Sequence, residues 1–92
     1  MRTIRLALAQ MNSIVGDLEG NFQKILKFVE KAVQQDADII AFPELALTGY
    51  PPEDLVLRAE FVEDNLSYLE KLLPYSHQIT ILVGFVNRRD DI

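Results

Sequence analysis

Three short apolar runs, separated by two stretches with a helical period, constrain the fold of this chain more than any other feature. The runs cover residues 4–9, 37–42 and 79–86, and each has the length of a buried strand. Strands that are apolar along their whole length and alternate with amphipathic helices are typical of βαβ units. The sequence therefore predicts an α/β fold with a mainly parallel sheet that is covered on both faces.

The two helical stretches are defined by apolar residues that recur three and four positions apart. The first follows Asn21, a residue type that often caps a helix N-terminus. Its expected apolar face consists of Phe22, Ile25, Leu26, Val29, Ala32 and Val33. The second begins near Arg58 or Ala59 and ends at Pro74. Its expected apolar face consists of Val62, Leu66, Leu69 and Leu73.

Charge and composition exclude several classes of function. The 9 Lys+Arg and 14 Asp+Glu give a net charge of -5, which argues against nucleic acid or an anionic membrane as the main partner. No apolar run approaches the roughly 18 residues of a membrane span, and the start of the chain does not have the pattern of a signal peptide. The chain has no cysteine, so it contains no disulfide, no thiolate metal site and no cysteine nucleophile.

The chain is short for the fold that it predicts. Three strands and two helices make a thin sheet, and a chain of 92 residues buries only about 60–65% of its unfolded surface. The last apolar run is followed by the polar residues 87–91, as in a sheet cut through a hairpin. We therefore expect residues 1–92 to be a fragment of a larger domain.

The loop after the second apolar run, residues 43–54, is the place where chemistry is expected. Ligands of open α/β sheets bind beyond the carboxyl ends of the strands. The loop contains three prolines and one glycine, so no regular element can span it. Gly49 permits a turn with positive φ, and Tyr50 adds an aromatic ring with a hydroxyl group beside the same loop.

Glu44 is the candidate catalytic residue of this loop. It follows the strand closely, and Pro43 fixes the backbone in front of it. Apolar Phe42, Leu45 and Leu47 are expected to surround it. A carboxylate held rigidly among apolar neighbours is suited to act as a general base near neutral pH.

Each of these features also has a purely structural interpretation. A lone loop glutamate is usually a solvated charge, and a tyrosine more often packs with its hydroxyl in water. Glu53 and Asp54 can cap the following helix or pair with Arg58. His77 has no second histidine at ligand spacing, and the aspartate pairs at 36/38 and 90/91 lack the spacing of a calcium loop, so no metal site is expected. No glycine-rich phosphate-binding motif occurs.

Several segments resemble the nitrilase (carbon–nitrogen hydrolase) superfamily. Residues 5–12, together with Gly16, Asp17 and Asn21, are similar to its opening, and so is the run of residues 37–45 with Phe-Pro-Glu-Leu. The extension at residues 46–55, which contains TGYPPEDL, resembles more narrowly the amino-terminal glutaminase domain of the glutamine-dependent NAD synthetase family. The resemblance covers essentially all 92 residues.

The resemblance implies both a fold and a catalytic set. The fold is the α/β, nitrilase-type four-layer αββα sandwich, of which this chain would supply the N-terminal part. The catalytic set is a glutamate, a lysine and a cysteine. Glu44 matches the glutamate, as general base on the thiol, and the lysine and cysteine would lie downstream of Ile92. Tyr50 would line the glutamine pocket or support Glu44.

The resemblance also implies ligands and partners of the full-length enzyme. Glutamine would supply ammonia, and an absent synthetase domain would use ATP and magnesium to amidate deamido-NAD. No cofactor or metal is implied for residues 1–92, which alone should be inactive. A cytoplasmic homo-oligomer without nucleic-acid or membrane partners is expected.

Two other functions stay open on the sequence. One is a stand-alone amidase of the nitrilase superfamily. The other is a non-catalytic α/β interaction module of flavodoxin or receiver type. Receivers need an acidic pair after the first strand, and Gln10-Met11-Asn12 provides none.

Overall fold

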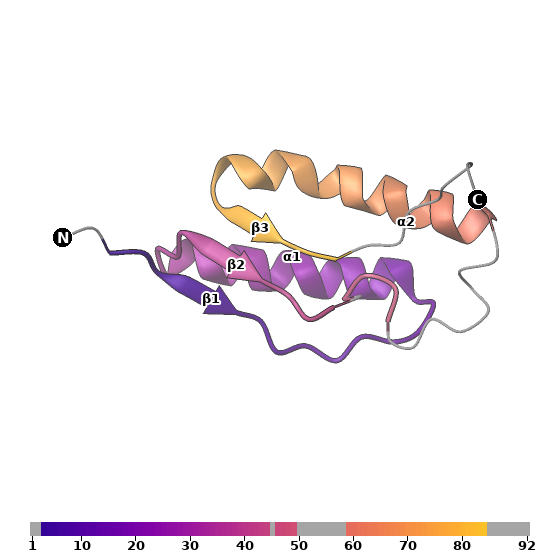
Figure 1. The fold of residues 1–92 in the computed structure, drawn as a ribbon, viewed down its shortest axis with the longest axis horizontal. Helices are drawn as coiled ribbons and strands as arrows, with labels where there is room; N and C mark the ends of the chain where they lie inside the picture. The colour runs from indigo at the N-terminus through magenta and orange to yellow at the C-terminus, as the bar shows by residue number, and fades with distance from the viewer. Residues whose placement is uncertain (1–2, 45, 50–58, 85–92) are drawn as a thin grey trace.

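The computed structural model describes residues 3–44, 46–49 and 59–84, and the predicted order of elements is confirmed within them. The strands are β1 (Leu6–Leu8), β2 (Ile39–Ala41) and β3 (Thr80–Leu82). The helices are α1 (Leu18–Gln34) and α2 (Ala59–Leu72), and a 3-10 segment, η2 (Leu73–His77), follows α2 (Figure 1). Both strand pairs are parallel and the sheet order is β1-β2-β3, so the α/β prediction with a parallel sheet is confirmed.

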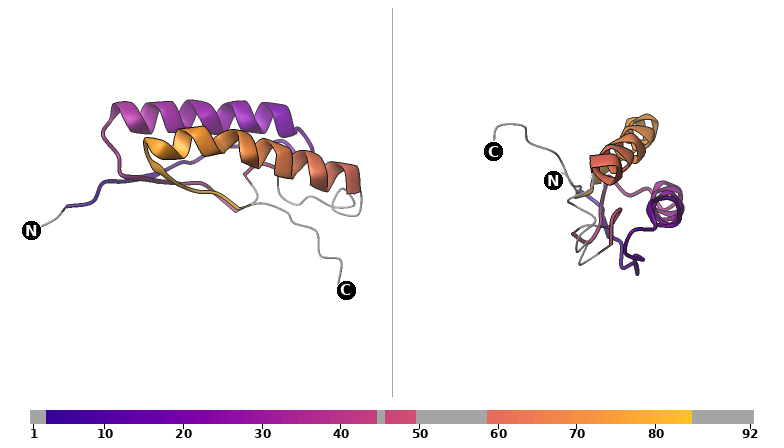
Figure 2. Two further views of the ribbon diagram at one scale, coloured as in Figure 1. Left: turned by 90° about the horizontal axis from the view of Figure 1, so that it is seen from above. Right: turned by 90° about the vertical axis from the view of Figure 1, so that its right-hand side faces the viewer.

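Both helices lie on the same face of the described sheet (Figure 2). The strand order advances in one direction, and crossovers between parallel strands are right-handed, so both crossover helices fall on one side. Ile40, in the central strand, is 1% exposed, whereas Leu6, Leu8 and Leu82 are 56%, 71% and 55% exposed. The prediction of a sheet covered on both faces is therefore wrong for the part of the chain that the structure describes.

The start of α1 differs from the prediction. The helix begins at Leu18, and its N-cap is Asp17, whose Oδ1 accepts a hydrogen bond from the Gly20 amide at 3.0 Å. Asp17 is a strong N-cap because its carboxylate accepts an otherwise unpaired amide and its charge faces the positive end of the helix. Asn21, the predicted N-cap, lies inside the helix with a fully buried side chain.

Backbone hydrogen bonds at the C-terminus of α1 redirect the chain toward β2. The Ala37 amide donates to the Ala32 carbonyl at 3.0 Å, and the Asp36 amide donates to the Val33 carbonyl at 3.1 Å. Asp36 has a φ of 60°, so the helix closes in a Schellman motif with aspartate at the position that glycine usually holds. Asp38 then accepts a hydrogen bond from the Arg5 amide at 2.8 Å, which confirms a structural role beside the strands.

The apolar face of α2 is only partly as predicted. Val62 is buried, but Leu73 is 62% exposed and Leu72 is 4% exposed. A 3-10 helix has about 3.0 residues per turn, so the spacing of apolar positions in α2 does not continue into η2, where Leu73 lies. The core between the helices and the sheet consists of Ala9, Leu18, Phe22, Ile25, Val29, Ala32, Ile40, Ala46, Leu47, Leu72 and Ile79.

Candidate functional site

The loops after β1 and β2 meet beyond the carboxyl ends of these strands (Figure 1). Pairing continues past the strands themselves, since the Ala9 amide donates to the Ala41 carbonyl at 2.9 Å and the Phe42 amide donates to the Leu82 carbonyl at 3.0 Å. The backbone that enters the second loop is therefore fixed to both neighbouring strands. Such a position is where ligand sites occur in parallel sheets.

Glu44 lies in a turn directly after this fixed segment. The turn is closed by the Ala46 amide, which donates to the Pro43 carbonyl at 3.2 Å. The side chain of Glu44 is exposed. A carboxylate in this place can accept a proton from a group that approaches the end of the sheet.

The apolar enclosure predicted around Glu44 is not formed by the described residues. Leu47 is 0% exposed and belongs to the core beneath the loop. Phe42 is half-buried and packs edge-on against Phe28, with ring centroids 6.3 Å apart. Leu45 lies outside the described residues. For Phe42 and Leu47 the prediction is wrong, because apolar residues next to a loop carboxylate can turn toward the core while the carboxylate stays exposed.

Asn21 joins the two loops from beneath. Its Oδ1 accepts a hydrogen bond from the Ile14 amide, and its Nδ2 donates to the carbonyls of Ile14 and Leu47, all at 2.8 Å. The side chain is 0% exposed, so these three bonds satisfy a buried amide that would otherwise be costly. The sequence analysis missed this role, although a polar residue within the apolar period of a helix was a signal for it.

Two further hydrogen bonds join the loops. The Ser13 hydroxyl donates to the Ala46 carbonyl at 2.6 Å, and the Gly16 amide donates to the Thr48 carbonyl at 2.9 Å. Together with the bond from Asn21 to Leu47, they attach three consecutive carbonyls of the second loop. We call this set of three interloop hydrogen bonds the loop clasp.

Gly49 completes the contact between the loops. Its φ is +83°, as its predicted role in a turn required, and a Cβ at this position would lie 2.6 Å from the Cα of Val15. Only glycine allows so close an approach with this backbone conformation. The backbones of the two loops are therefore in direct contact.

Most of the other candidate residues cannot be placed relative to this site. Tyr50, Glu53, Asp54 and Arg58 lie outside the described residues. His77 is exposed in η2, which agrees with the structural interpretation of this residue.

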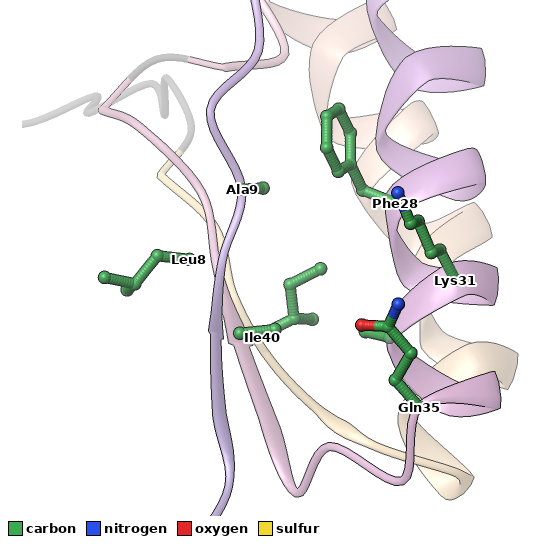
Figure 3. Close-up of a pocket in the computed structure, with 8 residues that line it drawn as sticks. Leu8, Ala9, Phe28, Lys31, Gln35 and Ile40 are labelled. Atoms are coloured by element: carbon green, nitrogen blue, oxygen red, sulfur yellow. The ribbon is translucent and has the colours of Figure 1, made fainter.

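A separate open hollow of about 180 Å³ lies between β1 and α1 (Figure 3). Ile40 points from the sheet toward α1, and Leu8 points away from it. Lys31 of α1 and Gln35, the C-cap of that helix, provide the polar groups of this hollow. Glu44 does not line this hollow, so it is not the candidate catalytic site.

One pair of titratable groups lies at the contact between α1 and α2. A hydrogen bond from the Tyr68 hydroxyl lowers the pKa of Glu19, and the same bond raises the pKa of Tyr68. The Tyr68 ring lies 5.2 Å from that of Phe22, with the Lys71 ammonium 4.4 Å from its centroid. These contacts join the two helices and have no connection to the loop clasp.

The described residues show neither a metal-binding cluster nor a membrane-spanning helix. Within residues 3–44, 46–49 and 59–84, no three His, Cys, Asp or Glu side chains are grouped so that they could hold a metal ion. Among the helices of this part of the chain, none is both long enough and apolar enough to cross a membrane.

The sequence matches a known protein family over most of its length. Residues 5–91 match the family described as carbon-nitrogen hydrolase. The chain belongs to the carbon-nitrogen hydrolase family. This finding confirms the resemblance to the nitrilase superfamily that the motifs around Glu44 indicated.

Two members of the family show which kind of enzyme the chain is similar to. The glutamine-dependent NAD(+) synthetase of Thermotoga maritima is 41% identical to the chain over 93 residues, and the match covers 99% of the chain. The crystal structure of a glutamine-dependent NAD(+) synthetase from Cytophaga hutchinsonii matches 99% of the chain with a TM-score of 0.92 and 33% identity. The chain spans 16% of the length of each of these two proteins.

The same fold occurs in an amidase. The crystal structure of an amidase from Nesterenkonia sp. matches 87% of the chain with a TM-score of 0.77 and 23% identity, and the chain covers 31% of it. At this identity the likeness concerns the fold alone. Together the two structures confirm the predicted fold class, α/β and part of a nitrilase-type fold.

Proposed function

We propose that residues 1–92 are the amino-terminal part of the glutaminase domain of a glutamine-dependent NAD synthetase. The observation that carries the proposal is the 41% identity to the Thermotoga maritima protein of that name across 99% of the chain. The position of Glu44 supports it, because an exposed carboxylate at the carboxyl end of the central strand can reach a group supplied from outside the chain.

In this proposal Glu44 is the general base of glutamine hydrolysis. It takes the proton from a cysteine thiol, and the thiolate attacks the side-chain carbonyl of glutamine. Glu44 then returns the proton to the departing nitrogen, so that a thioester forms and ammonia leaves. Water hydrolyses the thioester to glutamate and regenerates the thiol. The cysteine belongs to residues outside this chain, which contains none.

The ammonia would amidate deamido-NAD at a second site that uses ATP. In this proposal ATP and magnesium bind to the synthetase domain, outside residues 1–92. The chain has no glycine-rich phosphate loop.

The proposal also covers the role of Tyr50, the assembly and location of the intact enzyme, and the activity of the isolated chain. Tyr50 lines the glutamine pocket or supports Glu44. The intact enzyme is a homo-oligomer, and it works in the cytoplasm. Isolated residues 1–92 are inactive because the nucleophile is missing.

The test is Glu44→Gln in the intact synthetase that contains this chain. The amide cannot accept the thiol proton, so glutamine-driven synthesis of NAD should fall by at least about a hundredfold. Synthesis from added ammonium should persist, because it bypasses the hydrolase site. Both activities are measured by NAD formation under otherwise equal conditions.

Glu30→Gln is the matched control. Glu30 is an exposed glutamate of α1, and its substitution changes the net charge by the same amount. It should leave both activities unchanged. Equal loss of both activities in Glu44→Gln would assign Glu44 a structural role, and full retention of glutamine-driven activity would refute the proposal. A protein that hydrolyses an amide but forms no NAD from either nitrogen source would instead be a stand-alone amidase.

A further inference from the structure

The sheet and the loop clasp together hold the two ends of the segment that carries Glu44. On the strand side, the Phe42 amide is bonded to β3 through the Leu82 carbonyl at 3.0 Å. On the far side, the Ala46 carbonyl accepts from Ser13 at 2.6 Å. Because the Ala46 amide also closes the turn around Glu44, a bond to Ala46 restrains the turn itself.

The residues that follow the turn are held in the same way. Leu47 and Thr48 are each 0% exposed, and their carbonyls accept from Asn21 and Gly16 at 2.8 and 2.9 Å. Asn21 also holds the first loop through both hydrogen-bonding groups of Ile14. Since α1 carries Asn21 and contributes to the core, the clasp transmits the rigidity of a packed helix to the turn that carries the exposed Glu44.

We infer that Ser13 and Asn21 are positioning residues that place Glu44 for proton transfer. This inference rests on the proposed function, in which Glu44 is the general base. The side chain of Glu44 is exposed, so its location depends mainly on the backbone beneath it. A general base has to come within hydrogen-bond reach of its proton, and a displacement of about 1 Å can lower the rate about a hundredfold.

The decisive variants are Ser13→Ala and Ser13→Thr in the intact synthetase. Alanine removes the hydroxyl that donates to Ala46, whereas threonine keeps it. For glutamine hydrolysis we expect kcat to fall about tenfold in Ser13→Ala, with KM changed less than kcat, and to recover in Ser13→Thr. Ammonium-driven synthesis should stay at the wild-type level in both variants.

Ser76→Ala is the matched control. The Ser76 hydroxyl also donates to a backbone carbonyl, that of Leu73, at 2.6 Å, but it lies in η2. Its loss should leave the kcat of glutamine hydrolysis unchanged. Asn21→Leu removes the buried amide and keeps the number and branching of the side-chain heavy atoms, so it should lower this kcat about a hundredfold if the protein remains folded.

Several outcomes would overturn the inference. Ser13→Ala could keep the wild-type kcat, Ser13→Ala and Ser13→Thr could lose it equally, or ammonium-driven synthesis could fall in proportion. If Asn21→Leu does not fold, the Ser13 pair decides alone. Failure of the proposed function has a different signature, since Glu44→Gln itself would then keep its glutamine-driven activity.

Discussion

Gly49 offers the sharpest test of how the two loops fit together. At its φ of +83°, a Cβ would lie 2.6 Å from the Cα and 2.7 Å from the amide nitrogen of Val15. The left-handed conformation costs an L-residue about 1–2 kcal/mol. Carbon atoms pack at roughly 3.5 Å or more, so the first loop has to move away by about 1 Å. That movement weakens the hydrogen bonds to Leu47 and Thr48, each worth about 1 kcal/mol. We therefore expect Gly49→Ala to destabilise the paired loops by about 3–4 kcal/mol.

Native-state hydrogen exchange measures this loss locally. The amides of Ile14 and Gly16 report on the pairing, because their acceptors are Asn21 Oδ1 and the Thr48 carbonyl. Their protection should fall by two to three powers of ten in Gly49→Ala, at about 1.4 kcal/mol per power of ten.

Gly16→Ala is the control for the conformational part of the effect. Gly16 has a φ of 81° and is exposed, so alanine there should lower protection only about tenfold. The excess in Gly49→Ala then measures the contact with Val15. Equal losses of protection in the two variants would refute the close approach of the loops.

Three further predictions concern the helices and the sheet. The hydrogen bond from Tyr68 lowers the pKa of Glu19 below its ordinary value of 4.5. The bond therefore stabilises the folded state above pH 4.5, and this stabilisation is lost as the pH falls through the lowered pKa. Tyr68→Phe should therefore melt below the wild type at pH 7 and together with it in strong acid, as followed by circular dichroism. Ile40→Ala should cost about 2–5 kcal/mol in urea unfolding, and a cost below 1 kcal/mol would contradict the packing of this 1%-exposed side chain. Isolated residues 1–92 should associate through the uncovered sheet face. The double variant Leu8→Lys, Leu82→Lys should reduce this association, as measured by sedimentation velocity. Unchanged association would argue for another contact.

The element order could be predicted from the sequence because it depends on local periodicity. Continuous apolar runs identified all three strands, and the helical period identified both helices. Their boundaries were less certain because neighbouring residues compete for the same role. Asp17 and Asn21 are both good N-cap residue types, and only the packing of α1 against the core decides that Asp17 caps the helix. Leu73 likewise has the spacing of an apolar position but falls in η2.

The site could be predicted only in part from the sequence. Pro43 and the strand before it located Glu44 at the carboxyl end of β2, and Gly49 was correctly expected to permit positive φ. The buried role of Asn21 was not predicted, because its partners at Ile14 and Leu47 lie 7 and 26 residues away. The sequence marks Asn21 as a polar residue within an apolar helical period, but it does not identify partners at such separations, because these depend on tertiary structure.

Under the proposed function, one further layer of the domain would cover both an exposed apolar surface and an exposed carboxylate. The outer face of the sheet exposes Leu6, Leu8 and Leu82, an apolar surface that water disfavours. Glu44 is exposed at the end of the same sheet, without the apolar surroundings expected of a general base. In a four-layer sandwich, a second sheet packs on that face and can bring the catalytic cysteine toward the carboxylate. The loop clasp would thus hold Glu44 in place before the layer that completes its surroundings is added.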